Sequence, residues 1–139
     1  MRPAAQSAFN VVDSSGWIEF FLAGANGSHF RDVIVQTQHL IVPSVALYEV
    51  HKKLSSTVKP AHLAECLEVM QLAKVVDLTP QRAIAASLTA QVNKLAMADA
   101  IMYSIAQEFK AQFWTQDVDY AGLPQVNYLA KANQSMTHP

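Results

Sequence analysis

The sequence has a single cysteine, few glycines and no long apolar run. Cys66 alone cannot form an internal disulfide, a CxxC pair or a zinc site, so we expect a reducing compartment. The four glycines form neither a GxGxxG nor a GxxxxGK loop, which leaves nucleotide-cofactor functions without their loop. No apolar stretch approaches the ~18 residues of a membrane span, and residues 1–16 contain no signal-type apolar region. We therefore expect a cytoplasmic protein with no membrane partner.

Charged residues are also scarce. They make up 15% of the 139 residues, well under the ~25% of an average soluble domain, while 51% of the chain is apolar. This balance predicts one domain over residues 1–139, with much of its surface buried in the core or at subunit contacts. The formal net charge of -1 excludes a strongly basic nucleic-acid binder, so any such partner must be held locally.

Short apolar segments alternate with helical segments along the chain. Strands are expected at residues 9–13, 40–42, 74–78, 113–115 and 126–129, the last two separated by a polar loop. Helices are expected at residues 17–22, 30–38 and 97–110, and around the apolar positions 47, 50 and 54; 63, 67 and 70; and 84, 88 and 92. This order predicts an α/β fold, a three-layer α/β/α sandwich with a mostly parallel central sheet. The core spans about residues 9–130, and we expect a frayed tail at 131–139.

Residues that favour helix N-termini precede several of these helices. Ser14-Ser15-Gly16 offers N-cap chemistry to the first helix, and Ser44 offers it to the helix after the second strand. Pro60 suits a first helical position, and Thr79-Pro80 supplies a cap followed by a first helical position.

Acidic side chains fall close to the strand ends, where open parallel sheets place their functional sites. Asp13 ends the first strand, and Asp117 and Asp119 follow the fourth strand in FWTQDVDY. Glu49 lies about one and a half turns into the helix after the second strand, and Asp99 starts the helix before the fourth. Singly, Asp99 is explained by the helix dipole and Glu49 by a solvated helix face.

The segments that carry these acids resemble a known family. VVDSSGWIEFF, IVPSVALYEVHKKL, LAMADAIMYSIA and FWTQDVDYAGLPQVNYL occur in the order and with the spacing of the PIN-domain nucleases. Over about residues 9–129 the chain is most similar to the VapC-type toxins of toxin-antitoxin pairs. The resemblance implies an acidic quartet of Asp13, Glu49, Asp99 and Asp117. It also implies supporting hydroxyls at Ser15 and Thr115 and an additional carboxylate at Asp119.

Carboxylates that converge in one cleft repel one another, and a divalent cation relieves that repulsion. Oxygen ligands without cysteine or paired histidines favour Mg²⁺ or Mn²⁺ over zinc. Such a site suits phosphodiester hydrolysis by an activated water. The resemblance implies RNA as the substrate, with 5′-phosphate and 3′-hydroxyl products.

Basic residues near these acids are candidates for phosphate contacts. They are His51-Lys52-Lys53, directly after Glu49, and Arg31, although a solvated helix face explains Lys52 and Lys53 more simply. The resemblance further implies a homodimer and a cognate antitoxin bound in a groove beside the site.

Other functions are possible for a chain with this fold or with an aspartate after its first strand. A PIN domain can process RNA without a toxin role, or bind RNA or protein without catalysis. A haloacid-dehalogenase type of phosphotransferase needs DxD after the first strand, whereas this chain has Asp13-Ser14-Ser15. A receiver-like domain needs a lysine after a late strand, and FWTQDVDY contains none.

Overall fold

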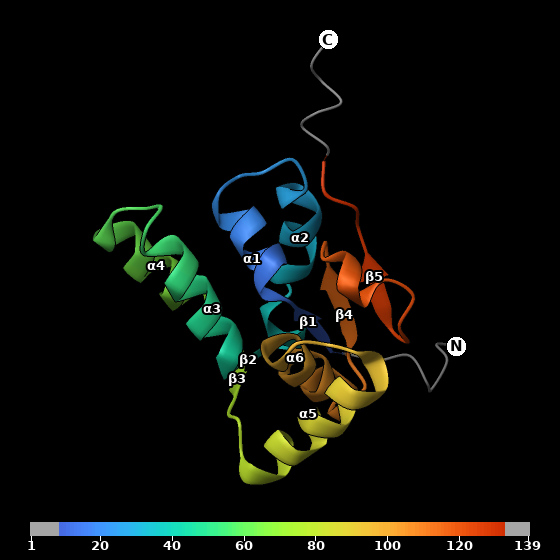
Figure 1. Cartoon of the computed structure of the whole chain (residues 1–139). Coiled ribbons are helices and arrows are strands. Elements are labelled where there is room, and N and C mark those ends of the chain that lie inside the picture. Colours follow the sequence, from blue (N-terminus) through green and yellow to red (C-terminus); the bar gives the residue numbers. More distant parts are fainter. Residues whose placement is uncertain (1–8, 133–139) are drawn as a thin grey trace.

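The computed structural model describes residues 9–132, which form a five-stranded sheet, six α-helices and two short 3₁₀ helices (Figure 1). The strands are β1 (Asn10–Val12), β2 (Leu40–Pro43), β3 (Lys74–Val76), β4 (Gln112–Thr115) and β5 (Val126–Tyr128). The α-helices are α1 (Ser14–Phe21), α2 (Gly27–Ile34), α3 (Ser44–Leu54), α4 (Pro60–Met70), α5 (Pro80–Asn93) and α6 (Met97–Glu108). The 3₁₀ helices are η1 (Thr37–His39) and η2 (Val118–Tyr120). Most of the tail expected at 131–139 lies outside the described residues.

The sheet has the strand order β3-β2-β1-β4-β5, and every neighbouring pair is parallel. Val11 and Val12 of β1 and Ile41 and Val42 of β2 are completely buried, as strands covered on both faces require. The prediction of a mostly parallel sheet is confirmed, and the sheet proves to be parallel throughout.

Helices cover both faces of this sheet. Figure 1 shows α1 and α2 on one side of the strands and α5 and α6 on the other, with α6 against β1, β2 and β4 and α5 packed on α6. The three-layer prediction is therefore confirmed.

The chain runs outward from β1 to β2 and β3, then returns to the other side of β1 for β4 and β5. The boundary between β1 and β4 is thus the topological switch point, where open α/β sheets form their crevice.

Two predicted helix caps are corrected. Helix α1 begins at Ser14 and is capped by Asp13, whose side chain accepts a hydrogen bond from the backbone of Gly16. Ser44 is the first residue of α3, and Pro43 before it makes no side-chain cap. The predicted cap at Thr79 is confirmed, since its hydroxyl accepts from Arg82 N–H at 3.2 Å. Pro60 is the first residue of α4, as predicted, and Lys59 is the N-cap residue.

Several predicted boundaries also differ. The helix expected at 30–38 begins at Gly27 and ends at Ile34, because the chain turns through η1 before entering β2. Strand β3 stops at Val76, two residues early, because only 74–76 pair with β2. The polar loop after β4 contains η2, which Asp117 caps by accepting the N–H of Asp119.

Helix α5 directs its large apolar side chains to solvent. Ile84, Leu88 and Val92 are 67%, 60% and 78% exposed. The side of α5 that packs on α6 is made of smaller residues: Ala86 is 4% exposed, and Ala90 packs against the buried core. Small residues let the two helix backbones approach closely, which leaves the larger side chains on the opposite face.

No helix within residues 9–132 is long and apolar enough to cross a membrane.

The close packing of α1 on the sheet makes a prediction about Gly16. A Cβ there would lie 2.7 Å from Val12 Cγ1 and 2.8 Å from the Phe30 ring. We expect Gly16→Ala to lower the free energy of unfolding by about 1–3 kcal/mol through overpacking. Gly122→Ala is the control, since Gly122 has φ +84° but nothing within 4 Å of its added Cβ. It should cost only about 1 kcal/mol, from backbone strain alone. Urea unfolding measures both, and an equal or larger loss at Gly122 would contradict the packing argument.

Candidate active site

Asp13 lies at the carboxyl end of β1 and is 2% exposed. Its Oδ1 accepts the Gly16 N–H at 2.9 Å, and its Oδ2 accepts the Thr115 hydroxyl at 2.7 Å. The Ser15 hydroxyl lies 2.8 and 2.9 Å from the two carboxylate oxygens. These bonds fix the carboxylate at the switch point and satisfy it despite its burial.

Thr115 connects Asp13 to the next carboxylate. It is the last residue of β4 and is fully buried. Its hydroxyl donates to Asp13 and accepts the backbone N–H of Asp117 at 2.9 Å. A single hydroxyl therefore sets the positions of two predicted site residues, one on each side of the switch point.

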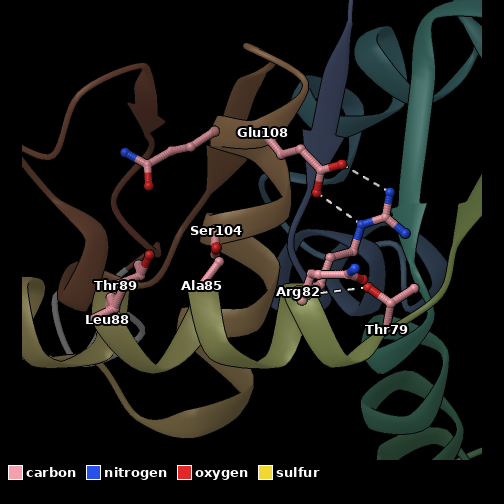
Figure 2. A pocket seen from close by; sticks show the side chains of 9 residues that line it. Thr79, Arg82, Ala85, Leu88, Thr89, Ser104 and Glu108 are labelled. Carbon is pink, nitrogen blue, oxygen red and sulfur yellow. Dashed lines mark hydrogen bonds and ion pairs between the residues drawn. The ribbon is translucent and has the colours of Figure 1, made fainter.

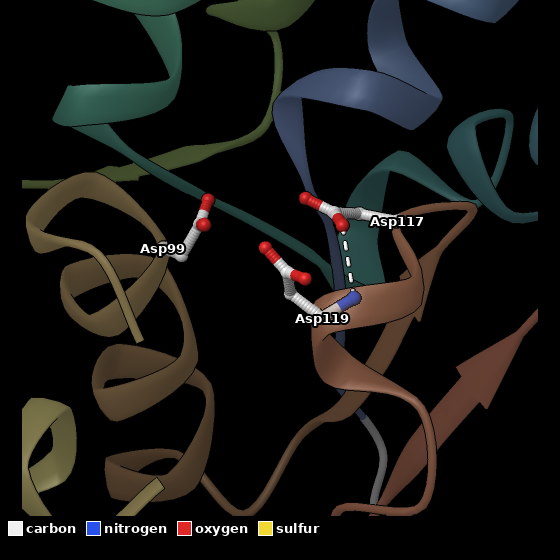
Figure 3. Close-up of side chains that lie close together, drawn as sticks. All are labelled: Asp99, Asp117 and Asp119. Carbon is white, nitrogen blue, oxygen red and sulfur yellow. Dashed lines mark hydrogen bonds between the residues drawn. The ribbon is translucent and has the colours of Figure 1, made fainter. Parts of the chain in front are cut away.

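Asp99, Asp117 and Asp119 form a close group. One carboxylate oxygen of each lies within 4.8 Å of the others. The close-up in Figure 3 shows the three side chains pointing toward one another. Asp99 comes from the first turn of α6, whereas Asp117 and Asp119 come from the η2 turn after β4. Asp99 and Asp117 are half-buried and Asp119 is exposed, so the group faces solvent on one side.

Glu49 belongs to α3 and lies outside this close group. The Ser14 hydroxyl donates to its Oε1 at 2.7 Å, which ties the α3 carboxylate to the first turn of α1. Glu49 is half-buried, and its charge raises the pKa of Asp99. It therefore lies near the acidic group on the side of α1 and α3.

Burial and mutual repulsion raise the pKa of two of these carboxyls. The pKa of Asp13 rises to about 6, mainly because burial penalises the charged form; its hydrogen bonds oppose the rise and Asp117 adds to it. Burial also raises the pKa of Asp99, the Tyr120 hydroxyl opposes this, and the neighbouring carboxylates add to the rise. Uncompensated negative charge thus accumulates at the site.

No cationic side chain of the described residues forms an ion pair with these acids. Within residues 9–132 the one ion pair joins Arg82 to Glu108, on α5 and α6. Arg31, Lys52 and Lys53 are exposed, and their expected phosphate contacts stay a prediction. An all-oxygen donor set that is half-buried and short of positive charge fits Mg²⁺ or Mn²⁺.

The structure brings together residues from four distant segments. All of the predicted acids lie at or near the carboxyl edge of the sheet. Asp119, predicted as an addition to the quartet, belongs to the close group. Asp13 and Glu49, predicted as members of the quartet, lie outside it. Sequence reasoning missed Ser14, which holds Glu49, and Tyr120, whose buried hydroxyl donates to the Asp99 carbonyl at 3.1 Å. The position of Tyr120, three residues after Asp117, could have indicated a helical turn against Asp99.

The geometry defines an α/β protein whose acidic site occupies the switch point of a parallel sheet. The model of the PIN domain family matches residues 11–125, and the chain belongs to this family. The predicted membership is confirmed.

Solved structures share the fold at low identity. A toxin-antitoxin complex from Klebsiella pneumoniae aligns with TM-score 0.75 and 16% identity, over 88% of this chain and 99% of that chain. DNA-bound VapBC from Salmonella typhimurium aligns with TM-score 0.69 and 16% identity, over 88% and 97%. VapC20 of Mycobacterium tuberculosis, a sarcin-ricin loop cleaving toxin, aligns with TM-score 0.66 and 14% identity, over 83% and 95%. A comparison with curated proteins gives no match.

The raised pKa of Asp13 makes a prediction about stability without metal. Because the unfolded chain releases this proton near pH 3.8 and the folded chain near pH 6, unfolding becomes easier as pH rises between these values. Above the folded-state pKa, the free energy of unfolding should be lower by up to about 3 kcal/mol. Asp13→Asn should remove this decrease in the free energy of unfolding. Asp32→Asn, which changes an exposed acid on α2, should keep it. Urea unfolding in EDTA across pH 4 to 7 measures both, and equal pH slopes in the two variants would contradict the assignment.

Proposed function

We propose that the protein is a metal-dependent endoribonuclease and the toxin of a toxin-antitoxin pair. The observation that carries the proposal is the group of Asp99, Asp117 and Asp119 oxygens within 4.8 Å, beside the buried Asp13. A helix-capping explanation accounts for single members of this set, but not for their convergence from β1, α6 and the turn after β4.

Asp99, Asp117 and Asp119 would hold Mg²⁺ or Mn²⁺, with Asp13 and Glu49 beside them. A bound divalent cation supplies Lewis-acid polarisation of the phosphodiester and makes water a stronger nucleophile. The residues supply position: Thr115 orients Asp13 and Asp117, Ser14 orients Glu49, and Tyr120 fixes the backbone of Asp99.

The reaction we propose is hydrolysis with water as the nucleophile, which leaves 5′-phosphate and 3′-hydroxyl ends. The half-buried site is open on the side of Asp119, so an RNA backbone can approach from solvent. The name of the VapC20 relative, a sarcin-ricin loop cleaving toxin, supports a nuclease role with RNA as the substrate.

An antitoxin partner is supported by the structural relatives that are toxin-antitoxin complexes. A groove of about 580 Å³ lies between α3 and α4. Its lining combines Leu47, Tyr48 and Leu67 with the polar side chains of His51, Lys52, Ser55 and Gln71. We assign this groove to an amphipathic antitoxin helix, whose apolar side chains would fill it. A small open reading frame next to this gene would separate a toxin from an RNA-processing PIN nuclease.

Charge removal tests the nuclease. Asp13→Asn and Asp99→Asn keep side-chain size but each remove one negative charge, so we expect at least ~100-fold slower RNA cleavage in folded protein. Cleavage should also require Mg²⁺ or Mn²⁺ and stop in EDTA. Asp117→Asn should cost more than Asp119→Asn, because Asp117 holds the fourth acidic position of the family resemblance. It is also half-buried and acts electrostatically on Asp13, whereas Asp119 is exposed.

The matched control is Asp32→Asn, which removes the same charge from an exposed position on α2. It should cleave a labelled single-stranded RNA at the wild-type rate. Near-wild-type cleavage by both Asp13→Asn and Asp99→Asn would show that the acids are a surface cluster and not an active site. Full activity in chelated buffer would exclude the metal mechanism.

We propose that the protein forms a homodimer through α5. The exposed ridge of Ile84, Leu88 and Val92 lies beside a groove of about 430 Å³ lined mainly by apolar and small residues of α5 and α6. Arg82, the single charged residue of α5, is already paired with Glu108, at one end of a second pocket along α5 (Figure 2). A surface with both a ridge and a groove suits a two-fold symmetric contact, in which each ridge enters the other copy's groove.

A charge on the ridge should break this contact. We expect wild-type protein to be dimeric in light scattering at tens of micromolar, and Leu88→Arg to be monomeric. Leu72→Arg is the control, since Leu72 is 71% exposed but lies between α4 and β3 and is not part of the ridge. A monomeric wild type, or a dimeric Leu88→Arg variant, would contradict the proposed interface.

A further inference from the structure

A second hollow opens on the same edge of the sheet as the acidic group. This pocket, of about 470 Å³, lies between η2 and the segment after β5. Its lining includes Gln116, Asp117, Tyr128 and Lys131. Asp117 also belongs to the close acidic group, so a chain that crosses the acids can continue into this pocket without leaving the surface.

Tyr128 offers an aromatic surface on a fixed backbone. It ends β5 in register with Thr115, which bonds Asp13, and it is 38% exposed. The ladder continues on either side of it, because Phe113 N–H donates to the Gln125 carbonyl and Leu129 N–H donates to the Thr115 carbonyl, both at 2.9 Å. A ring on a backbone held in this way loses little conformational freedom when a planar ligand stacks on it.

The far wall of the pocket is tied to the rest of the fold. Asn26, between α1 and α2, donates through Nδ2 to Gln116 Oε1 and to the Ala130 carbonyl, both at 3.0 Å. Gln116 also donates to Glu19 Oε1 at 3.3 Å and is 6% exposed. These contacts hold the segment after β5 against the turn after β4, so the pocket is built into the fold.

The lining chemistry suits a nucleotide better than an apolar peptide. Lys131 is exposed and is the one cationic residue among the residues that line the pocket, and Asp117 is the one anionic residue. An aromatic face next to a lysine is the combination that binds a base together with its phosphate. The groove between α3 and α4 also holds a tyrosine close to a lysine, Tyr48 and Lys52. It includes none of the acidic group, however, and its leucines suit an amphipathic helix, whereas the pocket at Tyr128 shares Asp117 with the acids.

We propose that this pocket binds a nucleobase of single-stranded RNA next to the scissile phosphate, stacked on Tyr128, with Lys131 contacting an adjacent phosphate. The proposal deepens the nuclease assignment and rests on it. Base stacking accepts any base, so the pocket would hold the strand in place without selecting its sequence.

Equilibrium binding tests the pocket independently of cleavage. Every protein carries Asp13→Asn to prevent turnover, and binding of a fluorescein-labelled, mixed-sequence 12-nucleotide RNA is followed by anisotropy in Mg²⁺. We expect Tyr128→Ala to raise Kd by roughly 5- to 100-fold, the effect of losing one stacked base. Tyr128→Phe should keep Kd within about twofold, because the ring remains, whereas Tyr128→Leu should resemble Tyr128→Ala because it lacks a π face.

Lys131→Ala should weaken binding and reduce the slope of log K against log salt by about 0.7, the value for one contact to a single strand. Lys110→Ala is its control, since Lys110 is exposed but precedes β4, at the opposite edge of the sheet. Thermal unfolding of each variant verifies that the fold is retained.

Parent-like Kd values for both Tyr128→Ala and Lys131→Ala would overturn the proposal. Loss of antitoxin binding by Tyr128→Ala with unchanged RNA binding would assign the pocket to a protein partner and also overturn it. If the wild-type protein cleaves no RNA but binds RNA in a way that depends on Tyr128, the pocket is supported and the nuclease function is contradicted. Failure of the pocket and failure of the nuclease function therefore give different results.

Discussion

The hydrogen bond from the Thr115 hydroxyl to Asp13 is the contact on which the site depends. It joins the carboxyl ends of β1 and β4 at 2.7 Å, and the same hydroxyl accepts the Asp117 N–H at 2.9 Å. Because Thr115 is fully buried, water does not compete for these bonds. The acids from two strands are thereby held at fixed positions where their charges repel, which an exposed or flexible turn could not maintain.

The burial of these carboxyl groups works against the negative charge that a metal site needs. Burial raises the pKa of both Asp13 and Asp99, so folding works against the charge that a cation would require. The fold compensates with neutral donors: Gly16 N–H and the hydroxyls of Ser15 and Thr115 all bond Asp13. Neutral donors stabilise a carboxylate without cancelling its charge, whereas a lysine in their place would leave little attraction for a metal.

Much of the fold could be predicted from the sequence, because apolar strands and helix signals are local. The order of strands and helices, the parallel sheet, the cap at Thr79 and the helix start at Pro60 all follow from such signals. The predicted cap of α1 is wrong, because Asp13 and Ser14 are both good cap residues. Only the backbone, which is extended at Asp13 and helical from Ser14, selects Asp13. The acids could be located at one edge, but the closeness of Asp119 to Asp99 depends on η2, a short turn without a periodic pattern.

Local sequence patterns also do not predict which apolar residues remain on the surface. Periodicity places Ile84, Leu88 and Val92 on one face of α5, but it does not say whether that face is buried within the chain or outside it. Ala86 and Ala90 decide this, because they pack in the core on the side of α5 that meets α6. A chain that is 15% charged and leaves such a ridge in water has apolar area to cover by association. That ridge, the groove between α3 and α4 and the pocket at Tyr128 differ in their chemistry, and this difference is what would let one small domain bind a copy of itself, a protein partner and RNA at separate places.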